Sequence, residues 1–478
     1  MSPNMGNLRT FLGLLLEKRP GDVFVVEREV DPKYEIMGFV EKFERQKKSP
    51  VFLFKKVKGT SLPVLVNLHA SFERLMLMFG TKTKEETVLR FMERADKRIP
   101  PKLVESGPVK EKVLKGNSAK LSILPQIIHN ELDGGPYICS AGTILRDPDT
   151  GSLNVGLYRN QIFADDKLGL MINPANHGSY ILNRYRELGK QVEVALVIGH
   201  HPAFLLSAGG ARLPYVGGEL ELAGALLGEP LKVVRGETVD LEYPADAEIV
   251  IEGIIDDPNN LVEEGDFGEY PRYYSGKRMV PVIRVTAICM RHDAIYQDIA
   301  AAHDEHIIMG SLPRMATYLK RIRELAPYVR MVNLPKSASS RAHIYVSIKK
   351  RNDGEGKQAG LAALAADPNI KMAVVVDDDI DVFDEEQVLW AVAFRFEADR
   401  DLVLIPYALG AHLNPSAYSL DRNKRGILQT RIIIDATWPV KGFEKAPVAK
   451  APEKILTKIS EEDALNKPHD PALKSLLE

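Results

Sequence analysis

The feature that most limits the fold of this chain is a long series of short apolar runs between about residues 121 and 302. Gly, Pro and Asp turns separate these runs, which include residues 194–198, 231–234, 247–255 and 280–290. Many short strands divided by turn residues predict a barrel or a sandwich rather than a doubly wound sheet. Helical periodicity interrupts the series at 179–188, and 220–227 is a second candidate helix.

Mixed helix and strand patterns flank this β-rich segment on both sides. Before it, a helix with one apolar face is expected around residues 8–16, followed by strands and helices at 22–30, 50–57, 61–68, 71–79 and 84–97. After it, an amphipathic helix is expected at 312–325, with strands at 342–349, 371–376 and 402–406. Asp384 precedes Glu385 and Glu386, so its carboxylate predicts a helix N-cap.

The predicted fold class is therefore α+β and multidomain, with a central β-rich domain between two mixed units. At roughly 150 residues per domain, the chain length suggests about three domains. We expect an N-terminal α/β unit at 1–115, a central domain at 116–307, a linker helix at 308–330 and a C-terminal α/β domain at 331–478. The Lys- and Pro-rich tail, 441–478, is expected to pack late or fray.

The composition limits which classes of partner the protein can bind and which cellular compartment is expected. Lys plus Arg is 63 and Asp plus Glu is 65, a formal charge of −2, which argues against nucleic acid or an acidic membrane as the main partner. The cysteines, Cys139 and Cys289, cannot form a disulfide framework or a zinc pattern, and residues 1–10 lack a secretion signal. A cytoplasmic location is expected. The uncharged stretch 194–211 contains Gly, Pro and His, which predicts a strand, a turn and a second strand rather than a membrane span.

The first candidate motif covers residues 154–159. In a strand Asn154, Gly156 and Tyr158 would share one face and Arg159 would point the other way. Asn154 offers an amide oxygen to a cation, and Arg159 offers a bidentate donor to a carboxylate or phosphate. The alternative is an exposed strand end with a surface Arg.

The second motif, residues 172–178, stands just before a predicted helix. Gly178 permits a close backbone approach, and the free amides of the helix start suit a phosphate. His177 offers a ligand to a metal or a donor to phosphate. The alternative is a plain turn with a capping Asn.

Two further motifs combine glycine with acids. Glu219 and Glu221 follow two glycines, and either acid can hold a hard cation or stand solvated at a helix start. In the loop 264–269, glycines on both sides of Phe267 allow a sharp fold that would bring Glu264 and Glu269 into one pocket. Such paired carboxyl groups do not ionise independently, and one acquires a raised pKa. The alternative is an acidic surface loop.

Two other polar clusters are weaker signals. Residues 377–381 contain four aspartates but lack the Gly and terminal Glu of a calcium loop, so we expect a turn at a strand end. His303 and His306, followed by Arg314, are expected to form the wall of a polar pocket. The spacing of these histidines is not that of a zinc helix motif.

In order and spacing, the four motifs resemble those of the UbiD-type decarboxylases, which use prenylated flavin mononucleotide (prFMN). The similarity spans about residues 110–440, and segments 244–253 and 297–300 extend it. The resemblance implies a split β-barrel flavin-binding domain between α/β units. It also implies a homodimer or a higher homo-oligomer through the C-terminal domain, and a flavin prenyltransferase that supplies the cofactor.

The resemblance also implies roles for individual residues. Asn154, His177 and Glu219 would hold Mn²⁺ or Mg²⁺ beside the cofactor phosphate, often with K⁺. Further cofactor contacts would come from Leu157, Tyr158, Arg159, Gly178 and Lys424. Arg159 would bind the substrate carboxylate and orient Glu264, and Glu269 would donate the proton that replaces CO₂. Under high CO₂ the reaction would reverse.

Two departures from the family pattern stand out: Asp266 replaces a usual Pro, and 173–175 replaces a segment found in some relatives. The expected substrate is an aromatic, heteroaromatic or α,β-unsaturated acid. The pattern favours furan-2,5-dicarboxylate or pyrrole-2-carboxylate, with His303, His306 and Arg314 as substrate contacts. The alternatives are an accessory subunit of a multi-subunit carboxylase, which would lack an acid or Arg159, and a flavin reductase.

Overall fold

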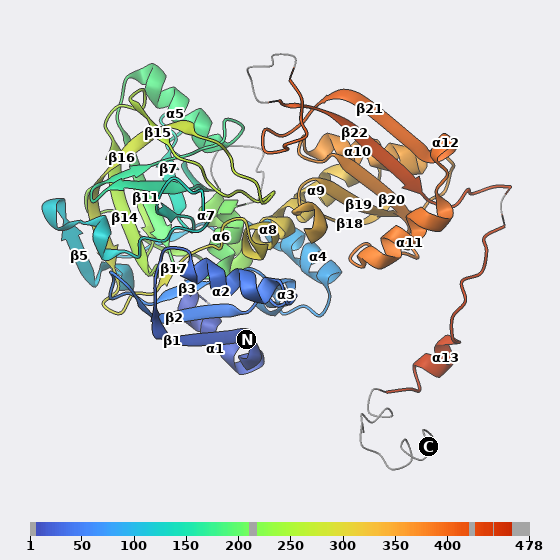
Figure 1. Cartoon of the computed structure of the whole chain (residues 1–478), viewed down its shortest axis with the longest axis horizontal. Coiled ribbons are helices and arrows are strands. Elements are labelled where there is room, and N and C mark those ends of the chain that lie inside the picture. Colours follow the sequence, from blue (N-terminus) through green and yellow to red (C-terminus); the bar gives the residue numbers. More distant parts are fainter. Residues whose placement is uncertain (1–5, 210–217, 420–425, 443, 461–478) are drawn as a thin grey trace, which may run out of the picture. The chain divides into compact units, whose positions relative to one another are not determined.

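The computed structural model describes residues 6–209, 218–419, 426–442 and 444–460. The chain divides into a large unit, residues 1–437, and a small one, residues 438–478. Within the small unit the described residues form one short helix, α13 (Glu453–Leu456). All other elements belong to the large unit (Figure 1).

The N-terminal region of the large unit contains a four-stranded sheet in the order β1-β2-β3-β17. Its strands are β1 (Val23–Val30), β2 (Val51–Val57), β3 (Val64–Val66) and β17 (Tyr296–Gln297). The helices of this region are α1 (Leu8–Lys18), α2 (Glu35–Glu44), α3 (Phe72–Phe79) and α4 (Lys84–Ala95). Strand β17 pairs in parallel with β3 although it follows the central domain in sequence.

The central region is built on a ten-stranded sheet whose ladders are all antiparallel. Its strands are β5 (Lys112–Lys115), β6 (Tyr137–Ile138), β7 (Gly142–Arg146), β8 (Leu153–Leu157), β9 (Asn160–Ala164), β10 (Lys167–Gly169), β11 (Val192–Ile198), β14 (Ile249–Ile255), β15 (Leu261–Glu264) and β16 (Arg278–Met290).

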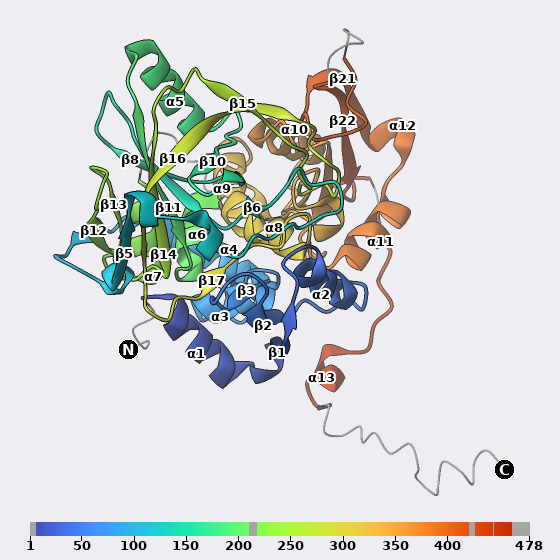
Figure 2. The same ribbon diagram turned by 60° about the vertical axis from the view of Figure 1, so that its left-hand side comes forward.

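Strand β16 is long and pairs with four other strands of this sheet (Figure 2). Its first half pairs with β15 and β10, and its second half pairs with β14 and β5. The sheet therefore curls into a half-barrel, and no ladder among the described residues joins β6 to β8. A small sheet beside it contains β4 (Lys102–Leu103), β12 (Lys232–Arg235) and β13 (Glu242–Pro244).

Three helices pack against the central sheet: α5 (His177–Leu188), α6 (Pro202–Gly209) and α7 (Glu219–Leu227). Helix α6 contradicts the expected second strand in 194–211, since residues 202–209 are helical. Almost every α6 side chain is buried, and an apolar run buried on all sides has no periodicity that separates helix from strand. Among the described residues, no helix combines the length and the apolar character needed to cross a membrane.

Both faces of the central sheet are covered, which explains its continuous apolar strands. Along β11, Val194 and Leu196 join the core that contains Phe52 of β2. The alternate residues Ala195 and Val197 join the second core, together with the buried side of α6.

The C-terminal region carries a five-stranded sheet in the order β18-β19-β20-β22-β21, with parallel inner strands and antiparallel edge strands. Its strands are β18 (Val329–Asn333), β19 (His343–Ile348), β20 (Met372–Asp377), β21 (Leu402–Leu409) and β22 (Leu428–Ala436). Its helices are α8 (Asp304–Met309), α9 (Ser311–Leu325), α10 (Glu355–Ala366), α11 (Glu385–Arg395) and α12 (Ala398–Asp401).

Two local predictions are confirmed in this region. Asp384 caps α11 by accepting the amides of Glu386 and Gln387. Asp377 ends β20, and the Arg395 guanidinium donates to the Asp377 carboxylate at 3.1 Å, so the aspartate cluster is a strand-end turn.

Candidate active site

The guanidinium of Arg159 contacts both glutamates of the 264–269 loop. It lies between β8 and β9, and a bridge pairs it with Met171. Its Nη2 donates to Glu264 Oε2 at 2.7 Å, and its Nη1 donates to Glu269 Oε1 at 2.6 Å. Nε is 3.1 Å from Glu264 Oε1, and Nη2 also reaches Ser275 Oγ at 3.1 Å. The convergence predicted from the flanking glycines is therefore present.

Phe267, the apolar residue of the acidic loop, is buried beneath this cluster. Its ring centre lies 4.7 Å from the guanidinium carbon of Arg159 and 4.8 Å from the ring of Tyr137. The Tyr137 hydroxyl donates to the carbonyls of Gly265 and Asp266 at 3.1 and 3.2 Å. The buried ring turns the backbone so that both flanking acids face Arg159.

The segment 129–139 forms a platform for the acidic loop. An ideal Cβ on Gly134 would lie 2.4 Å from the Cα of Gly265, so the two glycines allow direct backbone contact. The Gly134 amide donates to the Asp266 carbonyl at 2.7 Å, and the Gly268 amide donates to Asp133 at 2.8 Å. Sequence reasoning missed this platform, although the Asp-Gly-Gly-Pro run at 133–136 was an available turn signal.

A hydrogen-bonded cluster supports Phe267 from behind. The ring of His129 packs edge-on to Phe267 at 6.5 Å, and His129 Nε2 lies 2.7 Å from Asp298 Oδ2. Asp298 Oδ1 accepts the amide of Cys139, whose thiol lies 3.9 Å from His129 Nδ1. Burial raises the pKa of the Cys139 thiol. Because these polar atoms already have partners, the cluster fits a structural hydrogen-bond network that supports Phe267 better than a metal site.

The electrostatics of the acid pair are set by burial and by Arg159. Burial raises the pKa of Glu264, while its bonds to Arg159 oppose the shift. Burial also works against the charge of Arg159, but the two carboxylates outweigh it and raise the pKa of the guanidinium. The site therefore keeps a permanent cation beside an acid whose proton affinity is increased, an arrangement suited to moving a proton.

Asn154 and Glu219 form the second part of the site. Asn154 Nδ2 donates to Glu219 Oε1 at 3.1 Å, and the Val155 amide donates to Glu219 Oε2 at 3.1 Å. Burial raises the pKa of Glu219 to about 7. Asn154 Oδ1 is buried without a hydrogen-bond partner. A buried carboxylate beside an orphaned amide oxygen is the donor set expected for a hard cation.

Tyr158 connects this pair with the start of α5. Its ring lies against Gly156, where a Cβ would be 2.2 Å from the ring, so the two residues share a face as predicted. An ideal Cβ on Gly178 would lie 2.6 Å from the Tyr158 hydroxyl, so α5 begins directly against this side chain. His177 is the first residue of α5, and burial lowers its pKa. Among the described residues, no hydrogen bond joins His177 to Asn154 or Glu219.

The remaining residues that the sequence predicts as cofactor contacts are Leu157 and Lys424. Leu157 ends β8 and is half-buried, with its Cδ2 3.5 Å from where a Cβ on Gly209 would lie. Lys424 lies outside the described residues.

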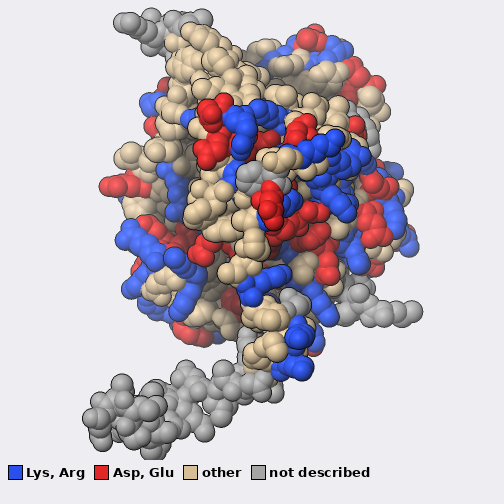
Figure 3. Space-filling view, turned by 90° about the vertical axis from the view of Figure 1, so that its right-hand side faces the viewer, with Lys and Arg blue, Asp and Glu red and all other residues tan. Residues whose placement is uncertain are grey.

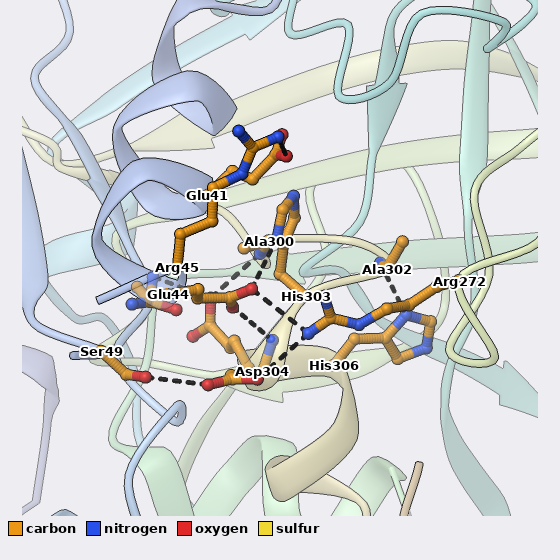
Figure 4. Close-up of polar contacts among 12 residues, drawn as sticks. Glu41, Glu44, Arg45, Ser49, Arg272, Ala300, Ala302, His303, Asp304 and His306 are labelled. Atoms are coloured by element: carbon orange, nitrogen blue, oxygen red, sulfur yellow. Dashed lines mark hydrogen bonds and ion pairs between the residues drawn. The ribbon is translucent and has the colours of Figure 1, made fainter. Parts of the chain in front are cut away.

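The three expected substrate contacts separate into two groups. His303 turns toward α2, where its Nδ1 lies 3.0 Å from Glu44 (Figure 4). His306 faces the ring of Tyr270 edge-on at 6.2 Å, and burial lowers the pKa of His306 to about 3. Arg314 donates to the Gly310 carbonyl at 2.7 Å. His306 therefore contacts Tyr270, the residue after Glu269, whereas His303 contacts Glu44 of α2 and Arg314 contacts Gly310.

Arg341 joins this second group and was missed from sequence. A Cβ on Gly310 would lie 2.5 Å from Arg341 Nη2 and 2.6 Å from Arg314 Nη1, so both guanidinium groups flank Gly310. Arg341 also stacks on Tyr270 at 4.8 Å, and burial, then the charge of Arg314, lower the pKa of Arg341 to about 9. No motif in the sequence signalled Arg341, because only folding brings it beside Arg314.

Comparison with known proteins fits this geometry. Three family models cover most of the chain: the N-terminal, Rift-related and C-terminal domains of 3-octaprenyl-4-hydroxybenzoate carboxy-lyase, UbiD, match residues 14–95, 102–303 and 307–436. The chain belongs to the UbiD family of carboxy-lyases. UbiD-family members are decarboxylases, and this chain is one of them by membership.

Individual UbiD-family relatives match over nearly their whole lengths. The anhydromevalonate phosphate decarboxylase of Methanothermobacter thermautotrophicus is 34% identical over 430 residues, covering 90% of this chain and 97% of the relative. The UbiD-class enzyme HmfF of Pelotomaculum thermopropionicum, solved in complex with FMN, is 37% identical with a TM-score of 0.87, covering 96% of this chain and 100% of HmfF. An evolved dimeric form of HmfF, solved with prFMN, is 36% identical with a TM-score of 0.84, over the same shares.

Proposed function

We propose that this chain catalyses the reversible, non-oxidative decarboxylation of a small unsaturated or heteroaromatic acid with prFMN. The single observation that carries the proposal is the contact of one guanidinium, Arg159, with both Glu264 and Glu269. The similarity to HmfF, which was solved with FMN and in an evolved form with prFMN, supports the choice of cofactor. A flavin prenyltransferase would supply it.

The residues fit the phosphate end of such a cofactor. Asn154 Oδ1 lacks a partner and Glu219 is buried, so a Mn²⁺ or Mg²⁺ ion would satisfy both, with His177 as a third ligand and K⁺ nearby. Leu157, Tyr158, Arg159 and Gly178 would contact the flavin. When bound, prFMN would supply the electron sink that an aromatic or vinylic carbon lacks on losing CO₂.

The chain's own residues would bind the acid and move the proton. Arg159 would hold the substrate carboxylate and keep Glu264 oriented, because its planar fork donates in several directions at once. Glu269 would deliver a proton from a carboxyl oxygen to the carbon that loses CO₂. Phe267 and the 129–139 platform would keep water from the lower side of the guanidinium.

The test is the Glu269→Gln variant, assayed after co-expression with a flavin prenyltransferase. We expect kcat for decarboxylation to fall by about 10²- to 10⁴-fold, because the amide cannot donate an acidic proton. Absorbance and mass of the bound flavin would show that the variant still loads the cofactor. Glu263→Gln is the control, since Glu263 is exposed and bonded to Lys277. Full turnover by Glu269→Gln would sink the proposal.

The two arginines beside Gly310 favour a substrate with a second anionic group. Arg314 and Arg341 flank Gly310, and among the described residues they donate to backbone carbonyls, Arg314 to that of Gly310 and Arg341 to that of Ser340. Adjacent like charges call for an anion between them. Furan-2,5-dicarboxylate, rather than pyrrole-2-carboxylate, fits this charge pattern. The name of one relative, anhydromevalonate phosphate decarboxylase, adds a phosphorylated acid as a second candidate.

The Arg314→Ala variant tests this choice. We expect it to raise KM for furan-2,5-dicarboxylate by about 10- to 100-fold, the loss of one charge-assisted contact. The KM for furan-2-carboxylate, the matched monoacid, should change by less than about threefold. Equal effects on the two acids would place the second anion elsewhere, and a phosphorylated unsaturated acid in the same panel tests the alternative.

Two alternatives make different predictions. An accessory subunit would lack one of the catalytic residues, whereas this chain has Arg159, Glu264 and Glu269 in contact. A flavin reductase would oxidise a nicotinamide and would tolerate Glu269→Gln. We expect neither behaviour.

A further inference from the structure

The turn that carries Glu269 is attached to a cluster of charged residues outside the catalytic group. This cluster, the Arg272 cluster, consists of Glu44, Arg272, His303, Asp304 and Lys336. Figure 4 shows Arg272 pointing at Glu44 and Asp304, with Ser49 reaching Asp304 from the N-terminal side. The cluster therefore joins α2, the acidic-loop region and α8.

The turn itself is tight and locally unfavourable. The Glu269 amide donates to the Tyr273 carbonyl at 3.0 Å, and the Arg272 amide donates back to the Glu269 carbonyl at 2.8 Å. Arg272 closes the turn with a φ of 66°, in the left-handed region that residues other than glycine rarely adopt. Such a conformation persists where surrounding contacts impose it, and it is often found at functional sites.

The side chains of this turn point to three different parts of the molecule. Glu269 reaches Arg159 at 2.6 Å. Tyr270 packs under Arg341 at 4.8 Å. Arg272 lies 3.3 Å from both Glu44 Oε2 and Asp304 Oδ1. The same turn therefore carries both the Glu269 carboxylate and the ion pairs of Arg272, three residues away.

The anchor is rigid because its acids are buried and hydrogen-bonded. The side chains of Glu44 and Asp304 are 6% and 2% exposed, whereas that of Arg272 is 52% exposed. Glu44 accepts the Asp304 amide at 2.6 Å, and Asp304 also holds Ser49 at 2.9 Å and Lys336 at 2.5 Å. Fixed anions facing a single arginine define where that arginine, and its turn, can lie.

We propose that Arg272 is a positioning residue that holds Glu269 against Arg159 by pairing with Glu44 and Asp304. This proposal depends on the proposed function only where the test measures decarboxylase activity. It assigns the N-terminal region an indirect part in the site, through Arg272, since Glu44 ends α2. Arg272 itself touches none of the catalytic side chains through a hydrogen bond among the described residues.

Two substitutions separate the side chain from the backbone. Arg272→Gly keeps the left-handed turn accessible and removes the ion pairs, and Arg272→Ala removes the ion pairs and strains the turn as well. We expect both to lower kcat by about 10- to 100-fold, with KM changed by less than about threefold, because the donor is misplaced rather than lost. Lys277→Ala is the control, since it removes an exposed ion pair between Glu263 of β15 and Lys277, the residue before β16. Turnover of Arg272→Gly at the wild-type rate would overturn the proposal.

A double-mutant cycle tests whether Glu44 acts through Arg272. If it does, Glu44→Gln should add little to the defect of Arg272→Gly, because both remove the same contact. Multiplicative defects would mean that Glu44 acts independently, and would contradict the proposed coupling.

A measurement on the cofactor-free protein separates this proposal from the proposed function. Hydrogen exchange should be faster in Arg272→Gly than in wild type in peptides that contain the Glu269 and Ser275 amides, which donate to Tyr273 and Phe267. It should be unchanged in Lys277→Ala. If Glu269→Gln were fully active but hydrogen exchange still rose in Arg272→Gly, only the proposed decarboxylase function would be wrong. If Glu269→Gln were inactive and hydrogen exchange did not rise in Arg272→Gly, only the positioning role of Arg272 would be wrong.

Discussion

At the scale of single residues, the contact between Gly134 and Gly265 sets where Glu264 and Glu269 lie. The backbones touch at a point where a Cβ on Gly134 would be 2.4 Å from the neighbouring Cα. Backbone atoms cannot move aside as a flexible side chain can, so any side chain here must displace the loop. The acids at both ends of the loop would move with it.

The Gly134→Ala variant is therefore expected to lose activity with a moderate loss of stability. Overpacking of this kind costs about 1–3 kcal/mol, and the displaced loop should lower kcat by about 10²-fold. Gly13→Ala is the control, because a Cβ at Gly13 of α1 meets nothing within 4 Å and should stabilise the helix slightly. Thermal unfolding and kcat would be measured together, and unaltered kcat in Gly134→Ala would contradict the platform.

At the scale of elements, Glu305 joins α8 to the N-terminal sheet. Its fully buried carboxylate accepts the amides of Asn67 at 2.7 Å, His69 at 3.0 Å and Ala300 at 3.0 Å. Burial by itself favours the neutral acid, but bonds from the His69 side chain and these amides outweigh it and lower the pKa of Glu305. The ionised carboxylate is therefore part of the folded structure.

The pH dependence follows from the direction of that shift. A carboxyl group whose folded pKa is lowered adds stability above its unfolded pKa of about 4.3, and loses that contribution as pH falls through the folded value. Glu305→Gln should destabilise the protein by about 3 kcal/mol at pH 7, with a smaller difference from wild type at pH 4. Urea unfolding at both pH values measures this, with Glu17→Gln at an exposed position as the control. A difference independent of pH would contradict the ionised role.

At the scale of the whole molecule, segments distant in sequence complete each other's sheets. Strand β17 completes the N-terminal sheet, and β5 pairs with β16 of the central sheet. On the face shown in Figure 3, Lys and Arg side chains are interspersed with Asp and Glu. In the C-terminal sheet, the edge strand β21 exposes Leu404, Tyr407 and Leu409.

We propose this exposed edge as the interface of a homo-oligomer. An apolar edge strand is a ready partner for a second copy. The Leu404→Lys/Leu409→Lys double variant should shift the protein from oligomer to monomer in light scattering. Leu325→Lys, at an exposed position at the end of α9, should leave the mass unchanged. A double variant that stays oligomeric would place the interface elsewhere.

Sequence reasoning succeeded where a pattern is local. The Asp384 cap depends on amides two and three residues away, and the meeting of Glu264 and Glu269 depends on glycines inside one loop. It failed for α6, where burial on every side removed the periodic signal. Sequence reasoning also did not foresee that the ring of His303 contacts Glu44 of α2.

The amino-acid sequence by itself determined the strands and helices with a clear period, and the set of side chains able to bind an acid and move a proton. Tertiary structure alone decided that Arg341 stands beside Arg314 and that Glu44 pairs with Arg272. The contact of Arg159 with Glu264 spans 105 residues, and only the resemblance to a known family predicted it. The physical reason is one of range. Backbone hydrogen bonds and side-chain alternation act over a few residues, whereas contacts between distant segments depend on how whole sheets and helices pack.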